Sequence, residues 1–321
     1  MNTWIAKILL VLALCGTVSA SLAQGYPSKP IHIVVGFPPG GGTDILARLV
    51  GAKLQETWSQ PVIIDNKPGA NSIIATEHVA KSAPDGYTLL ANGTNGMAIL
   101  PVLSPKLPYD SVKDFAPISI LGLFPLVLVV HPSVPARTVQ ELTAHLKANP
   151  GKLNYSSATT AFHVATEMFK QMTGTSVNHI PFKGSAQSVN AVVANTTQMT
   201  IIDMPPTMQL VKGGRLRALG VTTAKRVSID ATIPTLAESG VPGYDMEVFV
   251  GLFAPAATPA DIVAKLTAEA MRIVRLPDVR EKLLSIGIEP VGSTAEQMGD
   301  AVKAGIAKFR EVVRAGNIKA E

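Results

Sequence analysis

Residues 31–44 read IHIVVGFPPGGGTD and join a β-branched apolar run directly to the start of a helix. The run Ile31–Val35 predicts a buried strand. Beyond the glycines, apolar residues recur at helical spacing, at Ile45, Leu46, Leu49, Val50 and Leu54. This strand–junction–helix unit is the first of a series along the chain.

The junction from Gly36 to Asp44 has the chemistry of an anion site. A helix start points unpaired N–H groups outward, and the glycines Gly40–Gly42 let a ligand approach the backbone closely. No Lys follows Gly42, and Ile45 takes the place of the last glycine of a dinucleotide fingerprint, so nucleotide loops are excluded. The junction predicts either a carboxylate or phosphate site, or a tight turn that only packs the helix on the sheet.

Strand and helix patterns keep alternating beyond this unit. Further strands are predicted at 62–64, 87–90 and 118–120, and helices at 71–82 and 139–149. This alternation predicts an α/β fold with a mainly parallel sheet.

A boundary is predicted near Phe124-Pro125, where strand 126–130 opens a second cycle that runs to about Tyr244. The chain becomes helix-rich after the apolar segment 249–254, with helices predicted at 261–274, 278–286 and 295–315. If that segment crosses back, one lobe comprises 24–125 plus 250–321 and the other 126–249, with the two crossings as a hinge.

A second strand-to-helix junction lies in the second lobe. Leu153-Asn154-Tyr155 predicts a strand, 156–160 a hydroxyl-rich loop, and Ala165, Met168, Phe169 and Met172 a helix. Thr159 or Thr160 is either part of an anion site or simply a helix N-cap. Two such helix starts, one per lobe, predict a cleft. The loop 92–95 and Asp203, each after a strand, are further polar candidates.

The first residues predict a secretory signal peptide. Lys7 precedes the apolar run 8–14, which is too short to span a bilayer and is followed by small residues. Cleavage after Ala20 or Ala23 fits, and the second site is preferred, which gives a signal peptide of residues 1–23. A lipid anchor on Cys15 is disfavoured because Leu14 precedes it. Cys15 is the only cysteine, so the mature chain has no disulfide and no thiolate metal site.

Charge and aromatic content narrow the ligand class. Without Lys7 the chain keeps 27 basic and 23 acidic side chains, spread along the sequence rather than gathered into blocks. Only Trp58 of the two tryptophans remains after Trp4 is removed. Stacking sites for sugars or bases are therefore not expected, and nothing indicates nucleic acid.

Catalytic and metal chemistry find little support. Ser157, His163 and Asp203 are the residue types of a hydrolase triad, but there is no G-x-S-x-G elbow and His163 has apolar neighbours in a helix. The histidines form no i, i+4 pair; they are His32, His78, His131, His145, His163 and His179. We therefore expect no enzyme activity, no cofactor and no metal.

Several motifs stand in order along the whole mature chain: YPSKP at 26–30, FPPGG at 37–41, PDGYTLL at 84–90, LPYD at 107–110, VKDF at 112–115, KGS at 183–185, GRLRAL at 214–219 and LFAP at 252–255. In this series the chain resembles the Bug family, the periplasmic substrate-binding proteins of tripartite tricarboxylate transporters.

The resemblance implies a two-lobed periplasmic-binding-protein fold of type II (Venus flytrap) that closes on organic acids, often dicarboxylates. It implies a periplasmic monomer whose partners are a small carboxylate and, transiently, integral-membrane transporter subunits. The carboxylate would be gripped by two loops, and further residues would line the cleft, although Lys183 could equally be solvated. The implied ligand-binding residues are Phe37, Pro39, Gly40, Gly41, Gly42, Thr43, Thr94, Asn95, Ser156, Ser157, Thr159, Thr160, Lys183 and Asp203.

The chain departs from the family pattern in the second loop, where only seven residues separate Tyr155 from His163 and the usual glycines are absent. Phe162, Phe182 and Met204 also replace the usual residues. The altered pocket could admit an aromatic or longer apolar acid, or Phe162 could simply pack in the core. Two roles remain, a transport receptor for an organic acid and, as the alternative, a periplasmic sensor that presents the acid to a signalling system.

Overall fold

The structure, a computed structural model, describes residues 25–104, 106–316 and 318. The predicted signal peptide, 1–23, lies outside these residues. Within the described ranges, no helix combines the length and the apolar character needed to cross a membrane.

Parallel strands form the outer part of the first half of the sheet. They are β2 (Val62–Asn66), β1 (Ile31–Val35) and β3 (Thr88–Gly93), adjacent in that order. β9 (Glu247–Pro255) pairs antiparallel with β3 and with the first part of β4, and the short β10 (Glu289–Pro290) also joins β4. The helical segments of this half are α2 (Gly42–Trp58), η1 (Ala70–Ser72), α3 (Ile73–Ala80), η2 (Asn95–Ile99), α4 (Leu100–Leu103), α9 (Ala260–Arg275), α10 (Pro277–Ser285) and α11 (Ala295–Gly316).

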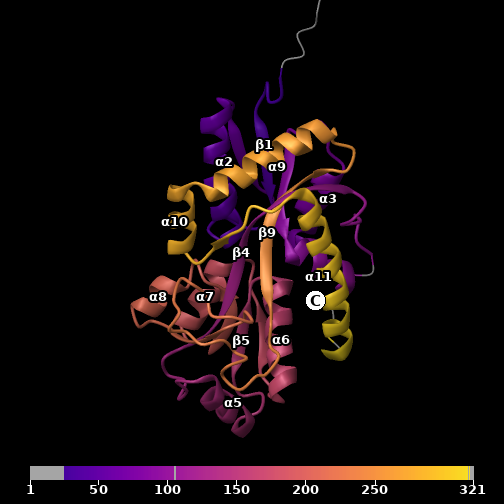
Figure 1. Cartoon of the computed structure of the whole chain (residues 1–321). Coiled ribbons are helices and arrows are strands. Elements are labelled where there is room, and N and C mark those ends of the chain that lie inside the picture. Colours follow the sequence, from indigo (N-terminus) through magenta and orange to yellow (C-terminus); the bar gives the residue numbers. More distant parts are fainter. Residues whose placement is uncertain (1–24, 105, 317, 319–321) are drawn as a thin grey trace, which may run out of the picture.

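The second half repeats this plan. β6 (Asn178–Pro181), β5 (Asn154–Ser157) and β7 (Met199–Asp203) run parallel, and β7 and β8 (Arg217–Val221) pair antiparallel with the end of β4. Its helices are α5 (Val139–Ala148), α6 (Thr160–Thr173), α7 (Ser185–Val193) and α8 (Met208–Lys212). In Figure 1 these helices lie below, α2, α3 and α9 lie above, and β4 and β9 run between the two groups.

β4 (Phe115–Val130) connects the two halves and corrects one prediction. The strands expected at 118–120 and 126–130 are one 16-residue strand. Pro125 does not break it, because the ladder changes partners there: β9 pairs with β4 as far as Pro125, and β7 pairs from Leu126. The Leu126 N–H is kept satisfied by the Thr222 hydroxyl, at 3.2 Å.

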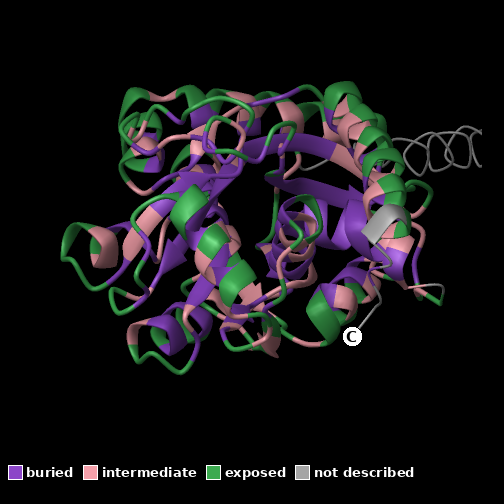
Figure 2. Cartoon of the chain, turned by 90° about the horizontal axis from the view of Figure 1, so that it is seen from below, coloured by how far each residue is buried: buried purple, intermediate pink, exposed green. Residues whose placement is uncertain are grey.

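Most predicted elements are present with small changes at their ends. The helix expected from residue 71 begins at Ile73, because Ala70, Asn71 and Ser72 all have positive φ. Thr138 and Thr159 accept hydrogen bonds from the N–H three residues on, which defines the starts of α5 and α6. Figure 2 shows the strands as buried ribbons among helices with exposed outer faces. The α/β, two-part architecture with parallel strands in each half is therefore confirmed.

Candidate functional site

Two adjoining cavities lie where the two halves of the sheet meet. The inner pocket has a volume of about 50 Å³, and the outer groove about 490 Å³. Both are lined by Phe37, Pro38 and Thr159, so they form one continuous cleft with a narrow end and a wide mouth. Since a single water needs roughly 10–15 Å³, the inner pocket in this conformation admits only a small chemical group.

The glycine-rich junction keeps its shape through contacts of its own. Gly40 has a φ of +90°, and Gly41 precedes the first residue of α2. The buried Asp44 carboxylate accepts hydrogen bonds from the Gly40 N–H at 3.0 Å and from Arg48 at 3.1 Å. Burial alone would raise the pKa of Asp44, but the hydrogen bonds from Arg48, Gly40 and Asn66 outweigh it and lower the pKa. The loop is thus preformed for a ligand.

One N–H at the start of α2 is occupied from the opposite half of the molecule. The Gly42 N–H donates to Oδ2 of Asp203, the last residue of β7, at 3.1 Å. Burial raises the pKa of Asp203, and the nearby Ser185 hydroxyl and the Gly42 N–H offset only part of that effect. A carboxylate of the protein therefore already sits at the helix start that the sequence predicts as an anion site.

The start of α6 shows the reciprocal contact. The Ala161 N–H donates to Oδ1 of Asn95 at 2.9 Å, and the Asn95 amide is fixed by donating to the Asn71 carbonyl at 3.0 Å. Each half of the molecule thus supplies a side chain to a helix start of the other half. Together with the Gly42–Asp203 contact, these hydrogen bonds define a closed cleft.

Most of the predicted site residues gather in this cleft. The inner pocket contains Phe37, Gly41, Gly42, Thr43, Thr94, Asn95, Thr159 and Asp203, and the outer groove contains Phe37, Ser157, Thr159, Thr160 and Lys183. Among the residues lining the two cavities, Pro39, Gly40 and Ser156 do not occur. Pro39 and Gly40 face solvent. Ser156 belongs to β5, and its hydroxyl donates inward to the Ser188 carbonyl at 3.0 Å.

Sequence reasoning missed the apolar wall of the inner pocket. Phe124, Val248, Phe249 and Val250 come from β4 and β9 and lie at its side. The sequence predicts these residues only as parts of a strand and of a crossing segment. An apolar run looks the same whether it faces the core or a ligand. Phe162, for which the sequence left two roles open, lines the inner pocket and also packs against the core.

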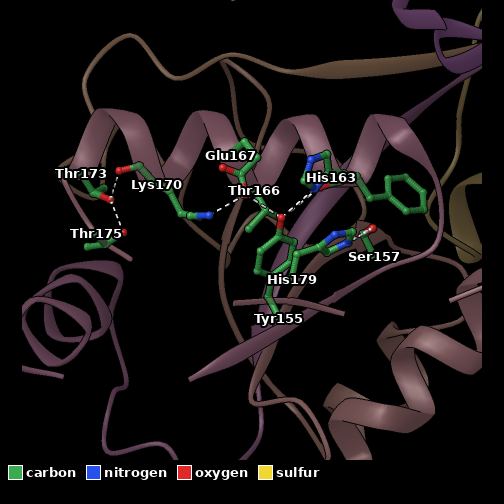
Figure 3. Close-up of polar contacts among 10 residues, drawn as sticks. Tyr155, Ser157, His163, Thr166, Glu167, Lys170, Thr173, Thr175 and His179 are labelled. Carbon is green, nitrogen blue, oxygen red and sulfur yellow. Dashed lines mark hydrogen bonds and ion pairs between the residues drawn. The ribbon is translucent and has the colours of Figure 1, made fainter. Parts of the chain in front are cut away.

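A polar network lies behind the outer groove, between β5, β6 and α6 (Figure 3). Ser157 Oγ and His179 Nε2 are 2.7 Å apart, and Tyr155 Oη and His163 Nδ1 are also 2.7 Å apart. The Tyr155 hydroxyl donates to Glu167, which also accepts from Lys170. Burial lowers the pKa of His179 to about 4, so the ring is neutral at neutral pH.

This arrangement differs from the triad considered above. Ser157 contacts His179, His163 contacts Tyr155, and Asp203 contacts Gly42. Nor do the described residues contain a group of three metal-ligating side chains.

Two lobes joined by long strands, with a cleft lined from both sides, define the class of periplasmic binding proteins. The chain belongs to the tripartite tricarboxylate transporter receptor family, whose model matches residues 46–318. It is similar to Protein BugT of Bordetella pertussis, with 33% identity over 98% of this chain and 97% of BugT.

Solved structures agree with this assignment. The chain is similar to a structure of the periplasmic binding protein BugD, with a TM-score of 0.87, 28% identity and coverage of 92% of this chain and 100% of that one. It is also similar to Rpa4515 of R. palustris with adipate (TM-score 0.89, 34% identity, 92% of this chain and 99% of that one). A third structure is MatC of Rhodopseudomonas palustris with bound malate (TM-score 0.84, 28% identity, 90% and 100% coverage).

Proposed function

We propose that this protein is a periplasmic receptor that captures a small organic acid in the cleft between its two lobes and delivers it to a tripartite tricarboxylate transporter. Family membership supports the receptor role, and the adipate and malate in two related structures support an acid as ligand. Export by the predicted signal peptide, a monomeric state and the absence of catalysis belong to the same proposal.

The observation that carries the proposal is a cleft built from both halves and rich in neutral donors. Its mouth brings Ser157, Thr159 and Thr160 at the start of α6 together with Lys183. Hydroxyl groups and helix N–H groups hold a carboxylate through charge-assisted hydrogen bonds. We place the ligand carboxylate in this outer groove, since Asp203 already occupies the start of α2 in the inner pocket.

The two sheet halves also define the proposed lobes. Partner exchange within β4 between Pro125 and Leu126 supports the first crossing at that point. The second crossing was expected at 249/250, but β9 pairs with β4 from Glu247 onward, which favours a position three residues earlier. Both crossings lie beside the inner pocket, so closure of the cleft and occupation of the pocket are mechanically linked.

A thermal-shift panel tests the proposal. Mono-, di- and tricarboxylic acids, aromatic ones included, are each compared with the corresponding amide. An acid at about 100 times its dissociation constant adds roughly 2.7 kcal/mol to the free energy of unfolding, whereas its amide, which lacks the charge, adds little. An acid and its amide that stabilise the protein equally would argue against a carboxylate site.

A further inference from the structure

The inner pocket has an unusual distribution of polar atoms. Its walls are mainly apolar, and no Lys, Arg or His occurs among the described residues that line it. The Asn95 side chain donates to the Asn71 carbonyl and accepts from the Ala161 N–H. The Thr94 hydroxyl oxygen accepts from the Phe249 N–H at 2.9 Å. These polar side chains are therefore committed to holding the pocket together.

Asp203 is different. The residue is only 3% exposed, and Oδ2 accepts from the Gly42 N–H. Oδ1 is also buried, yet it accepts no hydrogen bond of normal geometry from the described residues, although the Ser185 hydroxyl in the same pocket wall is near enough to lower the pKa of the carboxyl. Buried carboxylate oxygens normally have a partner, because an unpaired one loses its hydration without compensation.

From this geometry we infer that Asp203 Oδ1 accepts a hydrogen bond from the bound ligand, so that the ligand is an organic acid carrying a hydroxyl or ammonium group at the end that enters the inner pocket. The inference rests on the proposed function and adds the substrate class: hydroxy acids or amino acids rather than plain dicarboxylates.

Charge and size both favour this class. A second carboxylate in the inner pocket would face Asp203, and no cationic side chain of the described lining would compensate for the repulsion. A volume of about 50 Å³ suits a hydroxyl or ammonium group on a short chain. Burial raises the pKa of Asp203, and an ammonium group beside the carboxyl would lower that pKa again.

The experiment uses one carbon skeleton and varies only the group that reaches the pocket. Dissociation constants are measured by titration calorimetry at pH 7.5 for butanoate, for 2-, 3- and 4-hydroxybutanoate, for 2-, 3- and 4-aminobutanoate, and for succinate. At least one donor-bearing acid should bind about tenfold to hundredfold tighter than butanoate, and succinate should bind more weakly than that acid.

Asp203→Asn is the matched variant, because the amide keeps the shape and can still accept from Gly42 but presents a donor at the other position. It should abolish the preference for the donor-bearing acid over butanoate. Asp245→Asn, at a carboxylate that pairs with Lys308 outside both cavities, should leave the preference intact.

Three results would overturn the inference. One is equal affinity of the unmodified protein for butanoate and all its donor-bearing analogues. Another is an unchanged preference in Asp203→Asn. The third is weaker succinate binding in Asp203→Asn than in the unmodified protein, which would identify Asp203 as the protonated partner of a ligand carboxylate. Acids that bind without preference would leave the proposed function standing, whereas failure of every acid to bind, both here and in the thermal-shift panel, would remove both.

Discussion

Gly41 and Gly42 are neighbours at the start of α2, but their surroundings differ. A Cβ atom on Gly42 would lie 2.2 Å from Cε1 of Phe124, whereas one on Gly41 would have Ser185 Oγ at 3.9 Å as its nearest neighbour. The φ of Gly41 is −83°, which alanine adopts readily. We therefore expect Gly42→Ala to displace the buried Phe124 ring and to lower the free energy of unfolding by about 1–3 kcal/mol.

Gly42→Ala should also weaken ligand binding more than Gly41→Ala does, because the displaced Phe124 ring lines the inner pocket. Urea unfolding and calorimetric titration measure the two effects on each variant. Gly41→Ala serves as the control for stability and should unfold at nearly the same urea concentration as the unmodified protein, although Gly41 also lines the inner pocket. If the two substitutions behave alike, the glycines matter for backbone flexibility rather than for close packing at the pocket.

The elements of the site can be tested through their helix caps. Thr159 caps α6 at the cleft, and Thr138 caps α5 in the same way, through the N–H of Glu141. Replacement of either threonine by alanine should lower the free energy of unfolding by about 1 kcal/mol. Only Thr159→Ala should also weaken ligand binding, because Thr159 lines both cavities.

Denaturant unfolding and calorimetric titration of the two variants separate these effects. Equal loss of affinity in both would mean that α6 contributes to binding only through stability. If neither variant loses affinity, the ligand carboxylate does not bind at the start of α6.

The network between β5, β6 and α6 makes stability depend on pH. Burial holds the pKa of His179 at about 4 in the folded protein, while an unfolded histidine titrates near 6.5. The unfolded chain therefore binds the proton more readily, so the contribution of His179 is fully present above pH 6.5 and is lost as the pH falls towards 4. Urea unfolding from pH 7.5 to 4.5 should show this loss, and His179→Gln should reduce it. An unchanged slope in the variant would assign the loss to other groups.

Local patterns predicted the elements better than their partners. The β-branched run Ile31–Val35 and the apolar spacing of α2 are local signals, and both elements formed as expected. The insertion of β9 between β3 and β4 is not local, since Leu90 pairs with Phe253 across the intervening chain. The continuity of β4 through Pro125 also depends on this pairing, which explains why two strands were expected there.

The polar loops of the site were predictable from the sequence, but the contacts between distant residues were not. Polar loops at strand ends pointed to the cleft, because side chains there face the same edge of the sheet. The contact between Gly42 and Asp203 joins residues 161 positions apart, and no spacing rule reveals it. The apolar wall was not predicted either, because Phe124 and Phe249 are far apart in the sequence and meet only in the folded chain.

At the scale of the whole molecule, two cross-lobe hydrogen bonds close the cleft, Gly42 to Asp203 and Ala161 to Asn95. Because opening exchanges each of them for hydrogen bonds to water, each contributes only about 0.5–1.5 kcal/mol, so the open form should be populated when no ligand is bound. A ligand that contacts both lobes binds the closed form better and shifts the population towards it.

Small-angle scattering with and without a saturating acid identified by the thermal-shift panel tests capture by closure most directly. The radius of gyration should fall when the acid is added, and the curve of the complex should match the closed structure described above. A scattering curve that the bound acid leaves unchanged would contradict capture between two closing lobes.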